Sequence, residues 1–142
     1  MAFEPDIVVT AQDDPRINLV AEAKTHLRDM ERTEAGLKRY MVGMQCPIGL
    51  LITPEHLWLY RDSYVALTPD SVIRVGDFNI SEGIWGQTPP SQSSRFESFV
   101  QQWLEDLPQR PLFSFPPDLS DAIREYIIPA VTTGEVRAAH PR

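Results

Sequence analysis

Residues 5–24 read PDIVVTAQDDPRINLVAEAK, and this stretch decides the fold. Its two ends, PDIVVT (5–10) and INLVAEAK (17–24), are rich in β-branched and other apolar residues, which is typical of strands. The residues between them, AQDDPR, are typical of a turn, because Asp and Pro favour turn conformations. We therefore expect a β-hairpin centred on Asp14.

The second strand of this hairpin ends in charged residues. Side chains alternate across a strand, so Glu22 and Lys24 share one face. In the expected register Asp6 faces Glu22 and Glu4 faces Lys24, all on that face. Two opposed carboxylates repel unless a positive charge lies between them. Carboxylate oxygens at this spacing suit Mg²⁺, and Mn²⁺ is a second candidate. Asp6, Glu22 and Lys24 are therefore candidate site residues, and Glu4 offers a third acid.

A known family has this pattern. Pro5-Asp6, a turn, and then Glu22-Ala23-Lys24 at the end of an apolar strand resemble the motif of the PD-(D/E)xK nuclease superfamily, which has the restriction-endonuclease-like fold. Together with the helix and strands that follow, the resemblance covers about residues 4–61. This region is similar to the N-terminal nuclease domains of type I restriction enzyme motor subunits.

The resemblance implies an α/β fold, with a mixed sheet flanked by helices, and Mg²⁺-dependent hydrolysis of phosphodiester bonds in DNA rather than RNA. By position it makes Asp6 and Glu22 metal ligands, together with the Ala23 carbonyl, and Lys24 the catalytic lysine. The family's usual helix and strand before the Pro-Asp strand have no counterpart here. We therefore expect a second copy of the chain to cover the exposed sheet, which predicts a homodimer. The alternative is a catalytically inactive nuclease fold that serves as a binding or assembly module.

The rest of the chain is consistent with one domain spanning residues 1–142, with a core at about 4–80 and a helical part at about 91–142. Apolar spacing predicts a helix at about 29–45. Strands are expected at 48–53, 56–60 and 71–75, and a loop at 83–94. Further helices are expected at 94–107, with a capping box of Ser94 and Glu97, and at about 119–128, ending before Pro129.

Composition limits the classes of function. The net charge of −7 argues against a broad electrostatic surface for nucleic acid, although residues 24–45 carry five basic and three acidic side chains. No apolar run approaches the ~20 residues of a membrane span, and the first residues do not resemble a secretory signal. Cys46 is the single cysteine, which fits a cytoplasmic protein and excludes the usual Cys/His zinc site.

Aromatic residues are a further candidate feature. Trp58, Trp85 and Trp103 could stack on bases. Trp58 lies within an apolar strand and Trp103 within the apolar stripe of a helix, so we assign both to packing. Trp85 lies in the expected loop, so packing and base stacking are both left open for it.

Overall fold

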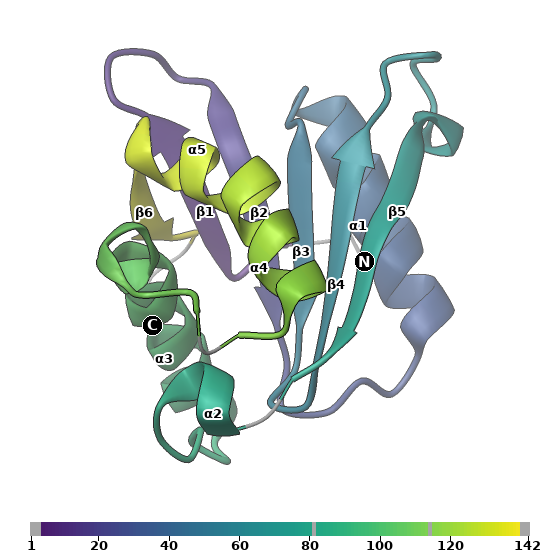
Figure 1. Ribbon diagram of the computed structural model, residues 1–142. Coiled ribbons are helices and arrows are strands. Elements are labelled where there is room, and N and C mark those ends of the chain that lie inside the picture. The colour runs from purple at the N-terminus through teal and green to yellow at the C-terminus, as the bar shows by residue number, and fades with distance from the viewer. Residues whose placement is uncertain (1–3, 81, 114, 140–142) are drawn as a thin grey trace.

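The chain forms a six-stranded mixed sheet with helices on both faces (Figure 1). The structure is a computed structural model and describes residues 4–80, 82–113 and 115–139. The strands are β1 (Ile7–Ala11), β2 (Ile17–Ala23), β3 (Ile48–Ile52), β4 (His56–Asp62), β5 (Val72–Asn79) and β6 (Gly134–Ala138). Their order in the sheet is β5-β4-β3-β2-β1-β6, with β2 and β3 parallel and all other neighbours antiparallel. This confirms the mixed α/β architecture that the sequence predicts.

The β1–β2 hairpin has the expected register at its open end. Ile7 lies opposite Ala21, and a bulge between Val9 and Thr10 interrupts the ladder. Because the bulge lies on the turn side, it does not shift the pairing at the other end. One further step of the same register sets Asp6 against Glu22.

Helix α1 (Met30–Gly43) crosses from β2 to the parallel strand β3. Asp29 caps its start by accepting a hydrogen bond from the Arg32 backbone N–H. Met41 is fully buried against the sheet and packs closely on Gly49 of β3, where a Cβ would lie 2.5 Å from the Met41 Sδ. Met44, expected in the same apolar stripe, is instead half exposed at the end of the helix.

Strand β6 occupies the edge of the sheet beside β1. It pairs antiparallel, with Ile7 opposite Ala138, and the Ala139 backbone N–H donates to the Asp6 carbonyl at 3.0 Å. The sequence analysis predicts no strand here and expects a second copy of the chain to cover the sheet. The same chain supplies the covering strand, so this reason for a homodimer is removed.

The C-terminal half is mainly helical, as predicted. Its helices are α2 (Glu82–Trp85), α3 (Ser93–Asp106), η2 (Leu107–Gln109), α4 (Pro117–Ala122), η3 (Ile123–Ile127) and α5 (Ile128–Thr132); a short η1 (Pro69–Ser71) precedes β5. The predicted capping box is wrong, because α3 begins at Ser93, with Gln92 as its N-cap and no side-chain capping bond.

The predicted end of the last helix before Pro129 is also wrong. A π-helical turn, η3, leads into α5, and Pro129 lies in the first turn of α5, where its missing N–H costs little.

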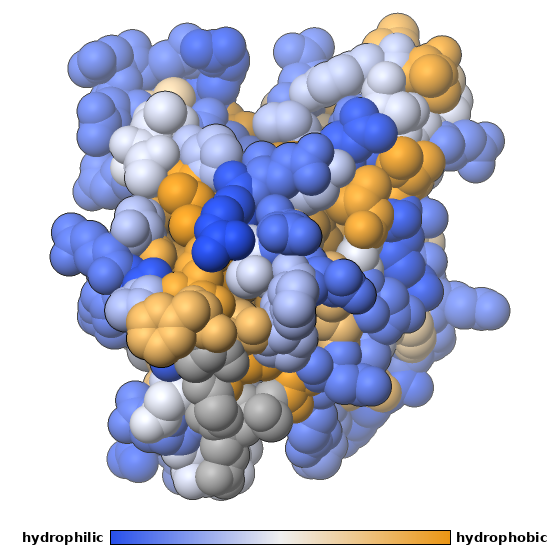
Figure 2. All heavy atoms as spheres, viewed as in Figure 1, coloured by the Kyte–Doolittle hydropathy of each residue, from blue (hydrophilic) through white to orange (hydrophobic). Residues whose placement is uncertain are grey.

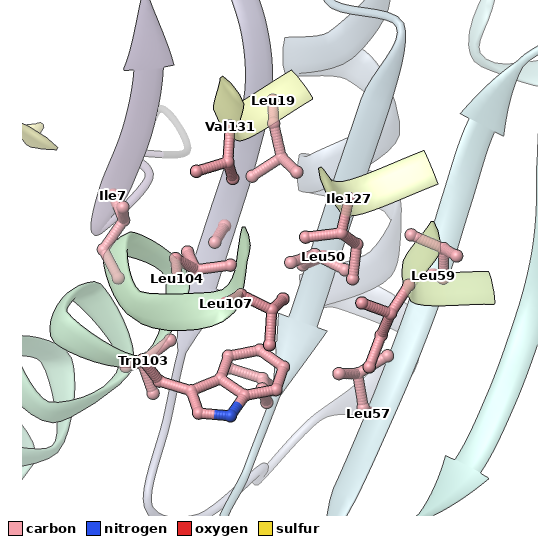
Figure 3. Packing of buried hydrophobic residues seen from close by; sticks show 14 of the residues in the cluster. Ile7, Leu19, Leu50, Leu57, Leu59, Trp103, Leu104, Leu107, Ile127 and Val131 are labelled. Atoms are coloured by element: carbon pink, nitrogen blue, oxygen red, sulfur yellow. The ribbon is translucent and has the colours of Figure 1, made fainter. Parts of the chain in front are cut away.

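The hydrophobic core has two layers. On one face of the sheet, the helical segments from α3 to α5 pack against β1 to β4, as Figure 3 shows for Leu104 of α3, Leu107 of η2 and Ile127 of η3. On the other face, a smaller cluster joins Leu37 and Met41 of α1 to the sheet.

Apolar side chains are exposed in the connection between β4 and β5, where Val65 is 80% and Leu67 93% exposed. This connection lies at the upper right of Figures 1 and 2. None of the helices within the described residues is long and apolar enough to cross a bilayer.

Candidate active site

Asp6, Glu22 and Lys24 converge in the folded chain. The Lys24 Nζ lies 3.1 Å from the Glu22 Oε1 and 3.7 Å from the Asp6 Oδ2. The carboxyl groups of Asp6 and Glu22 also share a hydrogen bond. The two acids are almost completely buried, whereas the Lys24 side chain is 44% exposed. The three residues selected from the sequence therefore form one compact group of two buried acids and a half-exposed lysine.

Backbone hydrogen bonds hold this group in place. The Asp6 N–H donates to the Ala21 carbonyl at 3.1 Å, and the Asp6 Oδ2 accepts from the Ala23 N–H at 2.9 Å. The Lys24 N–H donates to the Ile52 carbonyl of β3 at 3.0 Å. Because β6 also binds the Asp6 carbonyl, strands on both sides of β1 fix the position of this acid.

Burial dominates the electrostatics of the group. Burial, followed by the hydrogen bond and negative charge of Asp6, raises the pKa of Glu22 to about 9, against the opposing effect of Lys24. Partial burial alone would lower the pKa of Lys24, but attraction to Glu22 and Asp6 raises it. At neutral pH, therefore, Glu22 keeps its proton and Lys24 carries a positive charge.

Glu97 of α3 is a third acid near Lys24, and the sequence analysis assigns it to a helix cap instead. Its negative charge contributes to the raised pKa of Lys24. The start of α3 also approaches the end of β2, where the Ser93 Oγ lies 3.5 Å from the Thr25 Oγ1. Glu4, the third acid that the sequence offers, is exposed and precedes β1.

The donor set has the chemistry that a hard cation requires. The Glu22 Oε1 is buried and accepts no well-aligned hydrogen bond from the described residues, although the Lys24 Nζ is close. A buried carboxyl oxygen without a hydrogen bond costs free energy, and a cation bound in place of the proton would offset that cost. Among the described residues no cluster of three or more His, Cys, Asp or Glu side chains has metal-binding geometry. Any ion here would be held by Asp6 and Glu22, with water or substrate oxygens completing its coordination.

Two cavities lie next to the acids, at the carboxyl ends of β2 and β3. One, of about 500 Å³, is lined by Pro54, Ile80 and residues 88–91. The other, of about 310 Å³, is lined by Leu27, Thr53, His56, Trp58 and Asn79. Both include Thr25, His26 and Glu55. Both cavities therefore reach the residue that directly follows Lys24 in the chain.

The tryptophans differ from expectation in one case. Trp103 is buried, as predicted, and Trp85 is buried too, with its Nε1 donating to the Pro54 carbonyl at 3.0 Å. Trp58 packs against the smaller core cluster, as predicted, but it is also partly exposed and lines the smaller cavity.

Comparison with known proteins gives no relative: no protein-family model matches the chain, and no curated protein or solved structure matches it either. The geometry of the site is therefore the basis for its function.

Proposed function

We propose that this protein is a Mg²⁺-dependent nuclease of the PD-(D/E)xK type, with a restriction-endonuclease-like fold, that hydrolyses phosphodiester bonds in DNA. The observation that carries the proposal is the convergence of Asp6, Glu22 and Lys24 from two neighbouring strands. If the Glu-x-Lys pattern were accidental, a buried Asp on the neighbouring strand would not be expected to lie against both side chains.

The order of elements also supports the proposal. The resemblance implies a hairpin with the acids, a helix and then further strands, and β1, β2, α1, β3 and β4 follow in that order. It also implies a strand before the Pro-Asp strand. β6 lies beside the Pro-Asp strand from the other end of the chain, so an equivalent neighbour is present in a permuted position.

Each site residue has a role that its surroundings suit. Asp6 and Glu22 would hold the metal ion, which when bound polarises the phosphate and lowers the pKa of a bound water. Lys24 contacts both acids yet reaches solvent, so its amine can hold the attacking water and stabilise negative charge on the phosphate oxygens. Glu97 adds negative charge that keeps Lys24 protonated.

Calorimetric titration with MgCl₂ and MnCl₂ tests the metal site. We expect the native protein and Lys24→Met to bind the ion. Asp6→Asn and Glu22→Gln should bind about ten-fold more weakly or worse, because even a residue that only supports a metal ligand can contribute that much. Asp13→Asn is the matched control, since it removes an exposed acid from the turn of the same hairpin. The absence of metal binding by the native protein would contradict the proposal.

Cleavage of plasmid DNA in Mg²⁺, compared with EDTA, tests the chemistry. Lys24→Met should retain metal binding but lose about 100-fold or more of the cleavage rate, as expected when a donor that stabilises charge in the transition state is removed. Equal cleavage by Lys24→Met and the native protein would remove Lys24 from the mechanism. An RNA of the same sequence tests the expected preference for DNA.

The second candidate is an inactive nuclease fold that acts as a binding or assembly module. The net charge of −7 and the near-complete burial of both acids favour it. It predicts a native protein without metal binding or cleavage. The homodimer stays a prediction, although β6 now covers the edge of the sheet that a second copy was expected to cover. Sedimentation velocity distinguishes a monomer from a dimer.

A further inference from the structure

The smaller cavity lies on the same face of the sheet as the two acids. Glu22 pairs with Leu51, Leu51 pairs with Trp58, and Trp58 pairs with Asp77, so these residues form one row across β2, β3, β4 and β5. Side chains of paired residues point to the same face of a sheet. Trp58 is two strands away from Glu22, which is about 10 Å at the usual strand spacing.

Trp58 forms an aromatic wall of this cavity together with His56. The two ring centroids are 4.1 Å apart, with an angle of 34° between the planes. His56 is in turn held by an ion pair with Asp77, so the wall is fixed from the neighbouring strand. Tyr60, two residues further along the same face, is fully buried and bonded to Glu34 of α1. The partial exposure of Trp58 thus marks the end of the surface that α1 covers.

The polar groups of the cavity suit a neutral ligand with hydrogen-bonding edges. Thr53 and Asn79 bring a hydroxyl and an amide into it. Among the described residues that line it there is no Lys or Arg, and the one carboxylate is that of Glu55. A phosphate would find no lysine or arginine here, whereas Lys24 directly precedes Thr25, a residue of the lining.

We propose that this cavity binds an unpaired nucleobase of the strand whose phosphate lies at Asp6, Glu22 and Lys24, an inference that rests on the proposed nuclease function. The base stacks on the wall of Trp58 and His56, and its edge bonds to Thr53 and Asn79. Stacking on an aromatic side chain requires a base that is free of its partner strand. The protein is therefore expected to prefer single-stranded DNA, or unpaired regions, over duplex.

Tryptophan fluorescence tests this inference directly. The chain has three tryptophans, and Trp85 and Trp103 are each only 4% exposed, so Trp58 is the one that a bound base can reach. We expect a short oligothymidylate in EDTA to quench the fluorescence. An abasic deoxyribose phosphate chain of the same length should not quench it, and duplex DNA should quench it less. Equal effects of the oligothymidylate and the abasic chain, or no quenching at all, would overturn the inference.

Substitutions identify the residue responsible. Trp58→Leu should weaken binding of a labelled oligothymidylate by about five-fold or more, the lower end of what stacking one base contributes. Trp58→Phe keeps an aromatic ring, so it should lose the quenching but retain the affinity to within about two-fold. Phe113→Leu is the matched control, because it removes an exposed aromatic residue outside the cavity and should change nothing. Native affinity in Trp58→Leu would contradict the inference.

A second variant covers the case in which Trp58→Leu does not fold. Asn79 is exposed, and Asn79→Ala should weaken binding of the oligothymidylate by about three-fold, in line with the loss of one hydrogen bond. Unchanged affinity in this variant would count against the inference. Since these measurements need no metal, they are separate from the test of the nuclease. Quenching without cleavage would support the base-binding cavity and contradict the nuclease proposal. Cleavage without quenching would support the nuclease proposal and contradict the base-binding cavity.

Discussion

The Lys24 ammonium lies 3.1 Å from the Glu22 Oε1, yet the side chain of Lys24 is 44% exposed and that of Glu22 only 4%. This contrast decides the protonation of the pair. Removal from water and the nearby Asp6 together outweigh the attraction of the amine, so the pKa of Glu22 rises to about 9. The Glu22 carboxyl group therefore carries a proton that a bound cation would replace.

The raised pKa of Glu22 makes the stability of the metal-free protein depend on pH. The unfolded chain loses this proton near the ordinary value of 4.5, whereas the folded chain keeps it up to about 9. The resulting stabilisation is complete below the lower value and is lost as the pH rises toward the upper one. Over that window the free energy of unfolding should fall by about 1.4 kcal/mol per pH unit from this group. Glu22→Gln should remove this slope in urea unfolding between about pH 6 and about pH 8. An unchanged slope would show that Glu22 titrates normally.

Cys46 should be unreactive in the folded protein. Burial raises the pKa of its thiol to about 12, and its Sγ donates a hydrogen bond to the Ile48 carbonyl at 3.3 Å. Because the thiolate is the reactive form, a chromogenic disulfide reagent at about pH 8 should react only after the protein unfolds. If the native protein reacted as fast as the protein in denaturant, Cys46 would not be buried beside β3.

Gly49→Ala tests the close contact between α1 and β3. The added methyl group would meet the Met41 Sδ, so we expect a loss of about 1–3 kcal/mol in the free energy of unfolding, as for other overpacked cores. The double variant with Met41→Ala should cost less than the two single variants together, because the new methyl group then finds space. Strict additivity in chemical denaturation would show that the two residues do not touch.

Ending the chain at Thr133 tests the dependence of the site on β6. This truncation removes a strand from the edge of β1, together with the hydrogen bond from the Ala139 N–H to the Asp6 carbonyl. We expect a lower melting temperature and weaker Mg²⁺ binding than in the full chain. The full-length variant Glu135→Ala/Arg137→Ala, which changes only exposed side chains of β6, should retain both. Full metal affinity in the truncated protein would show that β1 and β2 suffice.

Local signals account for the parts of the fold that the sequence predicts. The β1–β2 hairpin has strong strand residues and a clear turn, and its bulge falls where it cannot displace Asp6 and Glu22. The convergence of Asp6, Glu22 and Lys24 could therefore be predicted before their contacts were known. Their burial could not be predicted, because it depends on packing by parts of the chain remote in sequence.

The features that the sequence missed have weak or misleading local signals. β6 is five residues long and carries Glu135 and Arg137, so nothing in its pattern marks it as a strand until β1 offers it an edge. Glu97 follows Ser94 at the spacing of a capping box, but α3 begins one residue earlier. Trp58 lies in an apolar strand, and only the limited reach of α1 leaves it partly exposed.

The pairing of β6 with β1 sets the time at which the site can form during synthesis. The residue that binds the Asp6 carbonyl, Ala139, is synthesised more than a hundred residues after Asp6 itself. A nascent chain therefore carries the acids and the amine without a finished framework. The framework of the site is therefore complete only after translation has passed residue 139.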